Sequence, residues 1–288
     1  MAANISLSVS VFTTGSGMAE QHFPLDAKSI RSGIRQDLAV QLSRLEVRDA
    51  THSTNDDLLG LSGKELHGYV LLAEQQTAGR GRRGKTWHSA AGNINMSIGL
   101  HLPRAAEFTG ALSLIVGIGV CRAMSRIGLN GHGIKWPNDI VLDQAKLGGI
   151  LVETRHRRKG MDAVIGIGIN VKMGSEARAS IDQPWADLAS QPGLEKTDRN
   201  QLVSIIIEEI LCALSDERID PKDYLSKHWT AWDVLRNVQI QVEREGEYFE
   251  GRAEGITPDG GLRLETLVPI KNVTQMVFHS GEVTVRHA

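Results

Sequence analysis

The sequence predicts an α+β protein in which a mixed β-sheet with helices is followed by a small β-barrel. Three observations predict this class. Apolar strand patterns flank a basic, glycine-rich loop at residues 74–89. Helical apolar patterns occupy residues 109–128 and 198–214. Short alternating strands separated by glycine turns fill the chain from residue 238 onward, and about 55 residues of this kind make a small barrel.

Composition limits the classes of function. The chain has 288 residues, 41% of them hydrophobic and 23% charged, and a formal net charge of −2. This balance argues against a general nucleic-acid binder or a binder of anionic membranes. Cys121 and Cys212 lie in apolar helical patterns and give no disulfide or metal spacing, which favours a reducing cytoplasm. The ten histidines are scattered, so we expect no structural metal.

The N-terminal part is expected to begin with an extension. Residues 1–17 carry no charged side chain and lack the apolar core of a secretory signal, so residues 1–24 are interpreted as a disordered extension or leader. Residues 25–45 predict one or two short helices broken near Gly33, and a strand follows at residues 45–47.

A polar cluster comes next. Ser53, Thr54 and Asn55 are good helix N-cap residues for a helix through residues 57–61, and they can equally present hydroxyl and amide groups to a polar ligand. Both interpretations stay open at this point.

The basic loop is the most informative stretch. Gly79, Gly81 and Gly84 allow unusual backbone angles or close approach to a ligand, and no acid occurs between Gln75 and His88. We therefore expect the loop to close over a phosphate or carboxylate, with Trp87 offering a flat face to a nucleotide base. A solvated or nucleic-acid-contacting loop is the alternative. The four cations are Arg80, Arg82, Arg83 and Lys85.

The loop lies between two predicted strands of one sheet, residues 69–73 and 93–102. Residues 109–128 predict a buried helix rather than a membrane span, because Ser113 and two arginines interrupt the pattern. Residues 133–142 predict a strand, a tight turn and a second strand, with Lys135 just before the turn.

Residues 146–153 and 163–171 predict an antiparallel pair of strands. In the second strand Gly166 and Gly168 fall on the face opposite the isoleucines, where they would clear a flat floor for a planar ligand. Further along the chain we expect a short helix around residues 185–188, a helix capped by Asp198, and a short helix over residues 221–232.

Four motifs together resemble the biotin protein ligase family. They are Gly79–Trp87 (GRGRRGKTW), Lys135–Asp139 (KWPND), Lys146–Glu153 (KLGGILVE) and Gly166–Asn170 (GIGIN), and Ser53 to Asn55 adds a fifth match. The resemblance covers the chain from about residue 25 to its end. It implies a catalytic domain over residues 25–235, similar to class II aminoacyl-tRNA synthetases, and an SH3-like domain over residues 236–288.

The resemblance also implies an activity. Biotin and ATP with Mg²⁺ would give biotinyl-5′-adenylate and pyrophosphate, and a lysine of a biotin carboxyl carrier protein would then attack the adenylate. Members of the family with an added DNA-binding domain also act as repressors. Residues 1–24 are too few and too uncharged for such a domain, so we expect a monofunctional enzyme without DNA binding and without membrane association. A homodimer through the catalytic-domain sheet is compatible with the resemblance.

Site residues follow from the resemblance, position by position. Lys135 matches the lysine between the biotin carboxylate and the α-phosphate, and Arg82 matches a loop residue that retains the adenylate, so these two are the expected catalytic residues. Positions matching the biotin and adenylate site are Ser53, Thr54, Asn55, Gln76, Arg80, Gly81, Gly166 and Gly168. Positions matching the nucleotide side are Gly79, Gly84, Lys85, Trp87, Asn138, Asn170 and, from the barrel, Arg286; no metal-ligating residue is expected.

One departure and two rival interpretations remain. Lys85 stands where many family members have arginine, which keeps the charge but removes bidentate geometry. A lipoate-protein ligase or octanoyltransferase shares the fold and a comparable lysine, but the basic loop argues against it. A regulator with a degenerate enzyme domain is the other rival, and the intact Lys135 argues against it.

Overall fold

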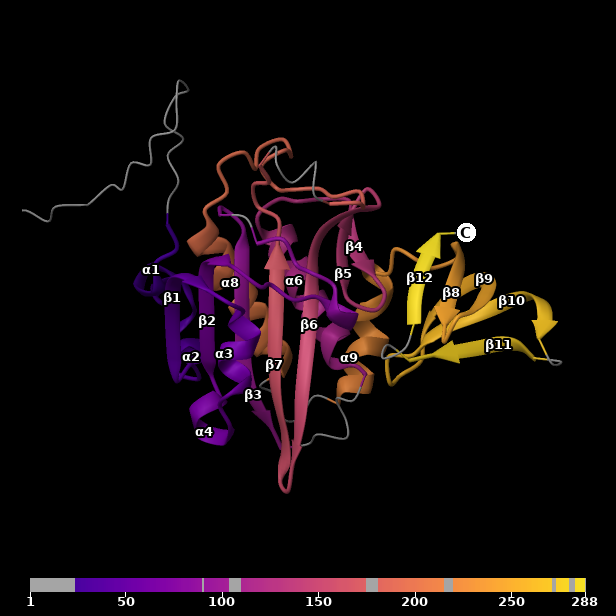
Figure 1. The fold of residues 1–288 in the computed structure, drawn as a ribbon, viewed down its shortest axis with the longest axis horizontal. Helices are drawn as coiled ribbons and strands as arrows, with labels where there is room; N and C mark the ends of the chain where they lie inside the picture. The colour runs from indigo at the N-terminus through magenta and orange to yellow at the C-terminus, as the bar shows by residue number, and fades with distance from the viewer. Residues whose placement is uncertain are drawn as a thin grey trace, which may run out of the picture.

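The computed structural model describes residues 24–89, 91–103, 110–174, 181–214, 220–270, 273–279 and 283–287. These residues form a seven-stranded mixed sheet with helices on both faces and a separate five-stranded antiparallel sheet (Figure 1). The expected α+β class is confirmed. The predicted N-terminal extension lies outside the described residues.

The large sheet has the strand order β1-β2-β3-β7-β6-β5-β4. Only β1 and β2 are parallel; every other neighbouring pair is antiparallel. The predicted antiparallel pair is confirmed as β6 and β7, the two longest strands of this sheet. The strands are β1 (Arg44–Thr51), β2 (Tyr69–Gln76), β3 (Ile94–Leu102), β4 (His132–Lys135), β5 (Asp139–Leu142), β6 (Ala145–Arg157) and β7 (Gly160–Ile169).

The two faces of the large sheet carry different helices. Because strand side chains alternate, Val70 and Leu72 join the main core while Tyr69 and Leu71 join a smaller cluster on the opposite face. The main core includes α1 (Ala27–Gly33), α2 (Gln36–Ala39), α6 (Leu112–Arg126), α8 (Arg199–Leu214) and α9 (Pro221–His228). The opposite face carries α3 (Thr54–Leu59) and α4 (Gly63–Leu66), seen in front of the sheet in Figure 1.

Most predicted helix boundaries have a visible cause. Gly33 ends α1 where a Cβ would come 2.7 Å from Ser204 Oγ, so this glycine lets α1 pack closely on α8. Ser53 is the N-cap of α3, and its side chain accepts a hydrogen bond from the backbone N–H of Asp56. Asp198 accepts from the backbone N–H of Gln201 at the start of α8, as its capping pattern predicts.

The short helix predicted around residues 185–188 is wrong. Trp185 forms a parallel β-bridge with Lys146 instead. The backbone N–H of Lys146 donates to the carbonyl of Pro184, and that of Ala186 donates to the carbonyl of Lys146. These backbone groups pair with the start of β6, so they are unavailable for helical hydrogen bonds.

The C-terminal module is one antiparallel sheet in the order β11-β10-β9-β8-β12. It packs against the main domain through Trp136, whose indole is 1% exposed and donates to the carbonyl of Gly260 at 3.0 Å. Residues of both modules belong to one hydrophobic cluster. The strands are β8 (Gln239–Arg244), β9 (Glu247–Ile256), β10 (Leu262–Ile270), β11 (Val273–Phe278) and β12 (Val283–His287).

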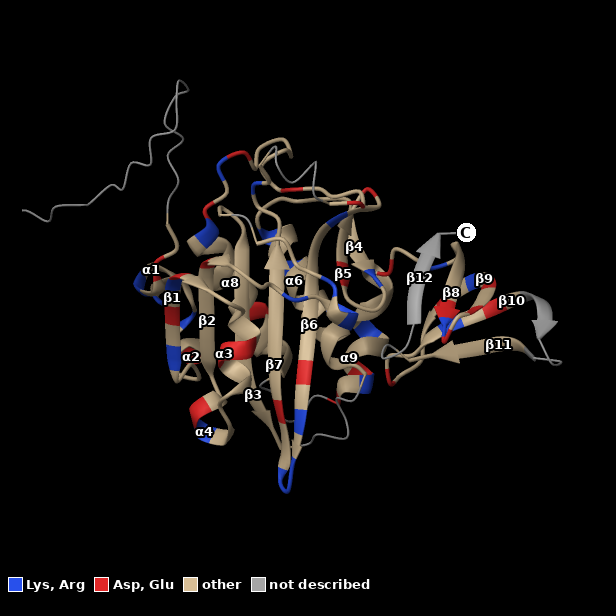
Figure 2. Cartoon of the chain, in the orientation of Figure 1, with Lys and Arg blue, Asp and Glu red and all other residues tan. Residues whose placement is uncertain are grey.

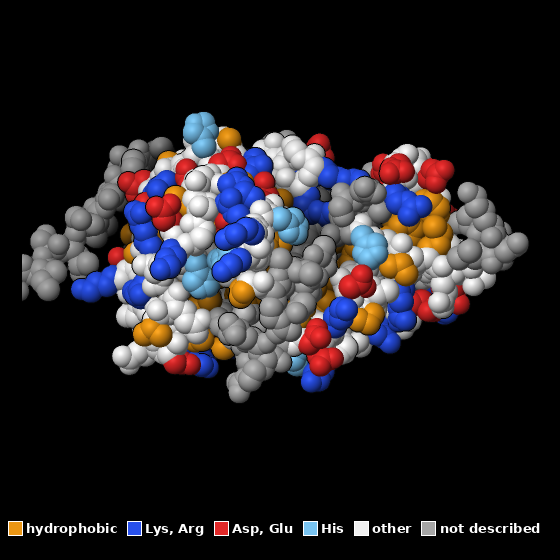
Figure 3. Space-filling view, turned by 90° about the horizontal axis from the view of Figure 1, so that it is seen from below, with side chains coloured by type: hydrophobic (Ala, Val, Ile, Leu, Met, Phe, Trp, Pro, Cys, Tyr) orange, Lys and Arg blue, Asp and Glu red, His pale blue; other side chains and the backbone are white. Residues whose placement is uncertain are grey.

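Charged side chains mark the turn between β6 and β7. Figure 2 shows this turn as a basic tip at the lower end of the sheet, and Figure 3 shows lysine and arginine side chains gathered on the lower surface of the molecule. The exposed residues at the tip include Arg155, Arg158 and Lys159. Within the described ranges, no helix combines the length and apolarity needed to cross a membrane.

Candidate active site

The basic loop folds as a small hairpin between β2 and β3. The backbone N–H of Gly81 donates to the carbonyl of Lys85 at 2.7 Å, and that of Trp87 donates to the carbonyl of Gly79 at 2.9 Å. Arg83 and Gly84 turn the chain in the left-handed region, with φ of 56° and 72°. The loop therefore has its own backbone hydrogen bonds and presents its side chains from a defined frame.

A pocket of about 340 Å³ lies between this loop and the large sheet, on the α3 face. It gathers most of the predicted site residues from separate parts of the chain. Gly79 and Gly84 do not line it, and Arg286 lies in β12 with a side chain outside the described residues. The predicted residues that line the pocket are Ser53, Thr54, Asn55, Gln76, Arg80, Gly81, Arg82, Lys85, Trp87, Lys135, Asn138, Gly166, Gly168 and Asn170.

The glycines of β7 make room for protein side chains, which differs from the bare floor expected from sequence. A Cβ on Gly166 would lie 2.5 Å from Asn55 Oδ1, and a Cβ on Gly168 would lie 2.4 Å from the indole of Trp87. Trp87 also donates from Nε1 to Asn95 Oδ1 at 3.2 Å. Gly166 and Gly168 thus permit Asn55 and Trp87 to lie directly on the strand.

Buried polar groups form one wall of the pocket. The Ser97 hydroxyl lies 2.7 Å from Thr54 Oγ1 and 2.6 Å from Asn55 Oδ1. Gln76 accepts from the backbone N–H of Thr54 at 2.9 Å and donates to Ser89 Oγ at 2.8 Å. The N-cap interpretation of the polar cluster is confirmed for Ser53. All three residues of the cluster line the pocket, and their contact with a polar ligand stays a prediction.

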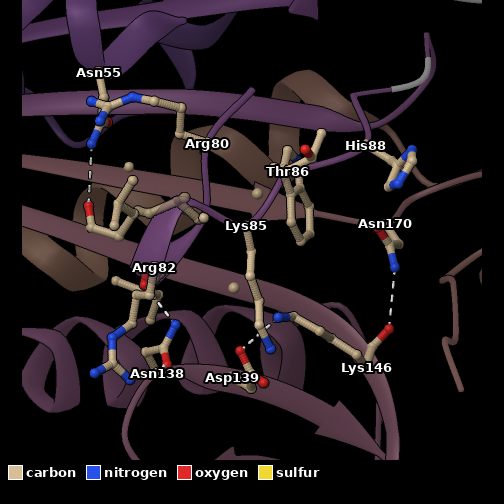
Figure 4. A pocket seen from close by; sticks show the side chains of 18 of the residues that line it. Asn55, Arg80, Arg82, Lys85, Thr86, His88, Asn138, Asp139, Lys146 and Asn170 are labelled. Carbon is tan, nitrogen blue, oxygen red and sulfur yellow. Dashed lines mark hydrogen bonds and ion pairs between the residues drawn. The ribbon is translucent and has the colours of Figure 1, made fainter. Parts of the chain in front are cut away.

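Cations outnumber acids in the pocket lining. The described lining holds six lysines and arginines but a single carboxylate, Asp139. Lys146 pairs with Asp139 at 2.7 Å, and its ammonium also lies 5.8 Å from the centre of the Trp87 ring. Figure 4 shows the Lys85 and Lys146 side chains converging beside Asp139. Lys146 was not among the predicted site residues, although the sequence places it at the head of a motif.

Arg82 is mostly buried and meets a neutral partner. Its guanidinium donates to Asn138 Oδ1 at 3.1 Å (Figure 4). Burial, and next the charge of Arg83, lower the pKa of Arg82, while Asp139 acts in the opposite direction. The guanidinium stays charged at any pH the protein experiences, so the lowered pKa expresses the cost of holding a cation in this place. An anion bound in the pocket would offset that cost.

Arg80 meets two carboxylates, which sequence order did not reveal. Its guanidinium lies 2.6 Å from Asp56 Oδ1 and 2.7 Å from Glu153 Oε2. The absence of acids along the loop sequence therefore does not leave the whole loop uncompensated in space. Arg80 differs from Arg82 in having protein acids as its partners.

Asn170 has a structural task at the edge of the pocket. Its amide nitrogen donates to the carbonyls of Lys146 and Ala186, at 3.1 and 3.0 Å. Both hydrogens of the amide are thereby used to hold the start of β6 beside the segment that carries Trp185. The expected contact of Asn170 with the nucleotide stays a prediction. It would be made by the side-chain oxygen, because both amide hydrogens are already used.

No group of three or more His, Cys, Asp or Glu side chains within the described ranges could hold a metal ion. The pocket offers Asp139 and the amide of Asn138 as oxygen donors. Mg²⁺ in nucleotide sites is commonly held by one or two carboxylates together with substrate phosphates. The donor set fits that arrangement and does not fit a metal site built from protein ligands alone.

The chain is similar to known proteins over two separate segments. Residues 45–170 match the biotin/lipoate A/B protein ligase family, and residues 236–286 match the biotin protein ligase C-terminal domain. The bifunctional ligase/repressor BirA of Escherichia coli is 34% identical over 241 residues, covering 82% of this chain and 72% of that protein. The chain belongs to the biotin protein ligase family.

Other family members extend the match. The biotin–[acetyl-CoA-carboxylase] ligase of Mycobacterium tuberculosis is 32% identical over 257 residues, which cover 84% of this chain and 90% of that protein. A solved biotin protein ligase from Aquifex aeolicus in complex with biotin and ATP superposes with a TM-score of 0.71 at 25% identity, covering 86% of this chain and all of that one. The family match confirms the expected catalytic fold and C-terminal SH3-like module.

Proposed function

We propose that the protein is an ATP-dependent ligase that activates biotin as biotinyl-5′-adenylate and transfers it to a lysine of a biotin carboxyl carrier protein. One observation carries the proposal: a pocket rich in cations lies between a buried polar wall and an indole, in a chain of the biotin protein ligase family. The relative from Mycobacterium tuberculosis is a biotin–[acetyl-CoA-carboxylase] ligase, the relative from Escherichia coli is a bifunctional ligase/repressor, and the similar solved structure contains biotin and ATP.

In the first step a biotin carboxylate oxygen attacks the α-phosphorus of ATP, and the bond to the pyrophosphate oxygen breaks. Two anions must meet, so cations at the point of attack lower the barrier most. Lys135 and Arg82 are the predicted residues for this task. Lys146 fits it as well, because its ammonium lies in the pocket lining beside both Trp87 and Asp139.

Thr54, Asn55 and Gln76 would hold the polar ureido ring of biotin, since their amide and hydroxyl groups converge in the pocket wall. When ATP binds, the Trp87 indole would either move away from Gly168 or stack on the adenine from its present position. Mg²⁺, entering with the phosphates of ATP, would neutralise charge that develops on the leaving pyrophosphate, with Asp139 and Asn138 as its protein-side oxygens.

In the second step the acceptor lysine attacks the acyl carbon as a neutral amine, and AMP leaves with the bonding electrons. The loop has to keep water away from the mixed anhydride until then. Its backbone hairpin and the side chains of Arg80 and Arg82 suit this cover.

Other parts of the proposal concern partners and place. A monofunctional enzyme without operator binding, located in the cytoplasm, is consistent with the composition. A homodimer would use an edge of the large sheet, where β1 and β4 are the outer strands. A gel shift on operator DNA and the molar mass in solution test these two statements.

Pyrophosphate release measured with biotin, lipoate and octanoate tests the activity. In the presence of ATP, we expect pyrophosphate release with biotin but not with lipoate or octanoate. When a carrier domain is added, we expect streptavidin to detect biotin attached to it. Release with lipoate or octanoate in place of biotin would reassign the substrate. A lack of release with all three would reject the ligase proposal.

A further inference from the structure

Arg80 is held from two different elements of the fold. Asp56 reaches it from α3, and Glu153 reaches it from β6 with both carboxylate oxygens, at 2.7 and 3.0 Å. Neither acid belongs to the loop or lines the pocket. The loop is thereby attached to the body of the domain through Arg80, which lines the pocket, by two acids that do not line it.

Glu153 also contacts the polar wall of the pocket. Its Oε2 atom accepts a hydrogen bond from Asn55 Nδ2 at 2.8 Å, while Arg80 binds the same oxygen. Asn55 is only 3% exposed, and its Oδ1 atom accepts from Ser97. Because one end of the Asn55 amide is fixed by Glu153 and the other by Ser97, Glu153 selects the orientation that Asn55 shows to a ligand.

The chain of contacts returns to the loop at its far end. Ser97 lies beside Thr54, Thr54 bonds Gln76, and Gln76 donates to Ser89, two residues after Trp87. Arg80 at the start of the loop and Ser89 after its end are thus joined through residues that line the biotin pocket. The polar wall and both ends of the loop therefore belong to one hydrogen-bonded network.

We propose that Glu153 is a positioning residue that couples occupancy of the polar pocket to closure of the basic loop over the adenylate. The inference rests on the proposed biotin ligase function. A ligand that fixes Asn55 stabilises the carboxylate that binds Arg80, and a closed loop in turn stabilises the ligand-ready Asn55, since coupling between two sites is reciprocal. Arg80 then serves the reaction through Glu153 rather than by touching the reacting atoms.

A simple exposed ion pair is the alternative. The Arg80 side chain is 40% exposed, and isolated pairs at such sites contribute little to stability. The two interpretations differ in what Glu153→Gln does. The glutamine keeps an acceptor oxygen for Asn55 but has no charge to hold Arg80. A mere surface pair would leave the loop's response to biotin unchanged.

Limited trypsin digestion of the loop, with and without saturating biotin, is the primary measurement. Arg82, Arg83 and Lys85 provide cleavage sites that Glu153→Gln leaves in place. We expect biotin to protect the wild-type loop, and Glu153→Gln to reduce that protection about fivefold, the lower range of typical coupling. The exposed pair of Arg35 and Asp37 supplies the matched control Asp37→Asn, which should behave as wild type.

A second readout follows the adenylate. We expect Glu153→Gln to release biotinyl-adenylate about fivefold faster than wild type, as detected by labelling of bystander lysines. In the Glu153→Gln background, Arg80→Gln should cause no more change than Asp56→Asn does, because each then breaks only the remaining Asp56–Arg80 pair. Wild-type protection and wild-type release in Glu153→Gln would overturn the inference. If the wild-type protein does not activate biotin, the ligase proposal is rejected rather than the role of Glu153. This result is obtained before any variant is compared.

Discussion

Strands β6 and β7 carry charged groups at both of their ends, and the two ends are built differently. At the hairpin end, Asp162 is buried and receives hydrogen bonds from Arg157 at 2.6 Å and His101 at 2.8 Å. At the pocket end, six cations in the described lining meet one carboxylate. The buried carboxylate of the hairpin end is paired inside the protein. The lining of the pocket end holds more cations than carboxylates, even though Arg80 pairs with Asp56 and Glu153 and Lys146 pairs with Asp139.

This difference teaches where function and stability lie in the same pair of strands. A compensated buried carboxylate contributes to folding and to its pH dependence. An excess of cations costs stability through mutual repulsion, and it persists where binding requires it. Substitutions at the pocket end should therefore change the rate of the reaction and leave the stability unchanged or increased. Substitutions at the hairpin end should lower the stability and leave the rate unchanged.

The largest effect is expected for the pocket lysines. Lys146→Ala should slow adenylate formation on the order of 1,000-fold, because it removes a preorganised cation from the pocket in which two anions have to meet. Lys135→Ala should act in the same direction, and comparison of the two identifies the lysine closer to the reacting carboxylate. Pyrophosphate release under single-turnover conditions is the measurement. Normal rates in both variants would remove the lysines from the mechanism.

Arg82→Ala should come next. Loss of this half-enclosed guanidinium should let biotinyl-adenylate leave about 100-fold faster, with a melting temperature equal to or above that of wild type. Labelling of an unrelated bystander protein reports the escaped adenylate. If Arg82→Ala lowers the melting temperature but still retains biotinyl-adenylate, Arg82 stabilises the fold, as Arg157 does, and does not hold the adenylate.

Asp162→Asn tests the hairpin end and should leave adenylation rates unchanged. Burial raises the pKa of Asp162, but hydrogen bonds from His101 and Arg157 outweigh it and leave the pKa below its usual value. The carboxylate therefore stabilises the fold above its unfolded pKa of about 4, and this contribution disappears as pH falls through the lower folded pKa. We expect a loss of about 2 kcal/mol at pH 7 that shrinks toward acidic pH. Denaturant unfolding at several pH values measures it, and a pH-independent loss would contradict the assignment.

The smallest effect is expected where the barrel meets the pocket end. Trp136→Phe keeps an aromatic ring in this buried site but removes the donor to the Gly260 carbonyl, and the lost hydrogen bond alone costs about 1 kcal/mol. Because Trp136 lies between Lys135 and the turn at Asn138, kcat/KM for ATP should fall about threefold. An unchanged kcat/KM with reduced stability would confine Trp136 to holding the two modules together.

Local sequence signals predicted much of this molecule. Alternation identified the strands of both sheets, and Gly33, Ser53 and Asp198 marked helix ends through their backbone chemistry. The motifs of the family located most pocket residues, because each motif sits on a strand end or loop that turns toward the same cavity.

Nonlocal contacts escaped that reasoning. The partners of Arg80 lie 24 residues before it, at Asp56, and 73 residues after it, at Glu153, so no pattern along the loop could show them. The contact of Trp87 with Gly168 could not be predicted for a similar reason. The sequence shows that a glycine has no side chain, but it does not show which other side chain fills that space. Trp185 reads as helical until its bridge to Lys146 is seen.

Thermal unfolding with a non-hydrolysable biotinyl-adenylate analogue tests the central claim most directly, because a ligand that binds only the folded state raises the melting temperature by an amount that grows with the logarithm of its affinity. The excess of cations over carboxylates in the pocket lining predicts a large rise for wild type, an equal rise from a lower starting point for Asp162→Asn, and little or no rise for Arg82→Ala and Lys146→Ala. Equal rises in all four proteins would contradict the account, since the cations would then contribute nothing to holding the adenylate.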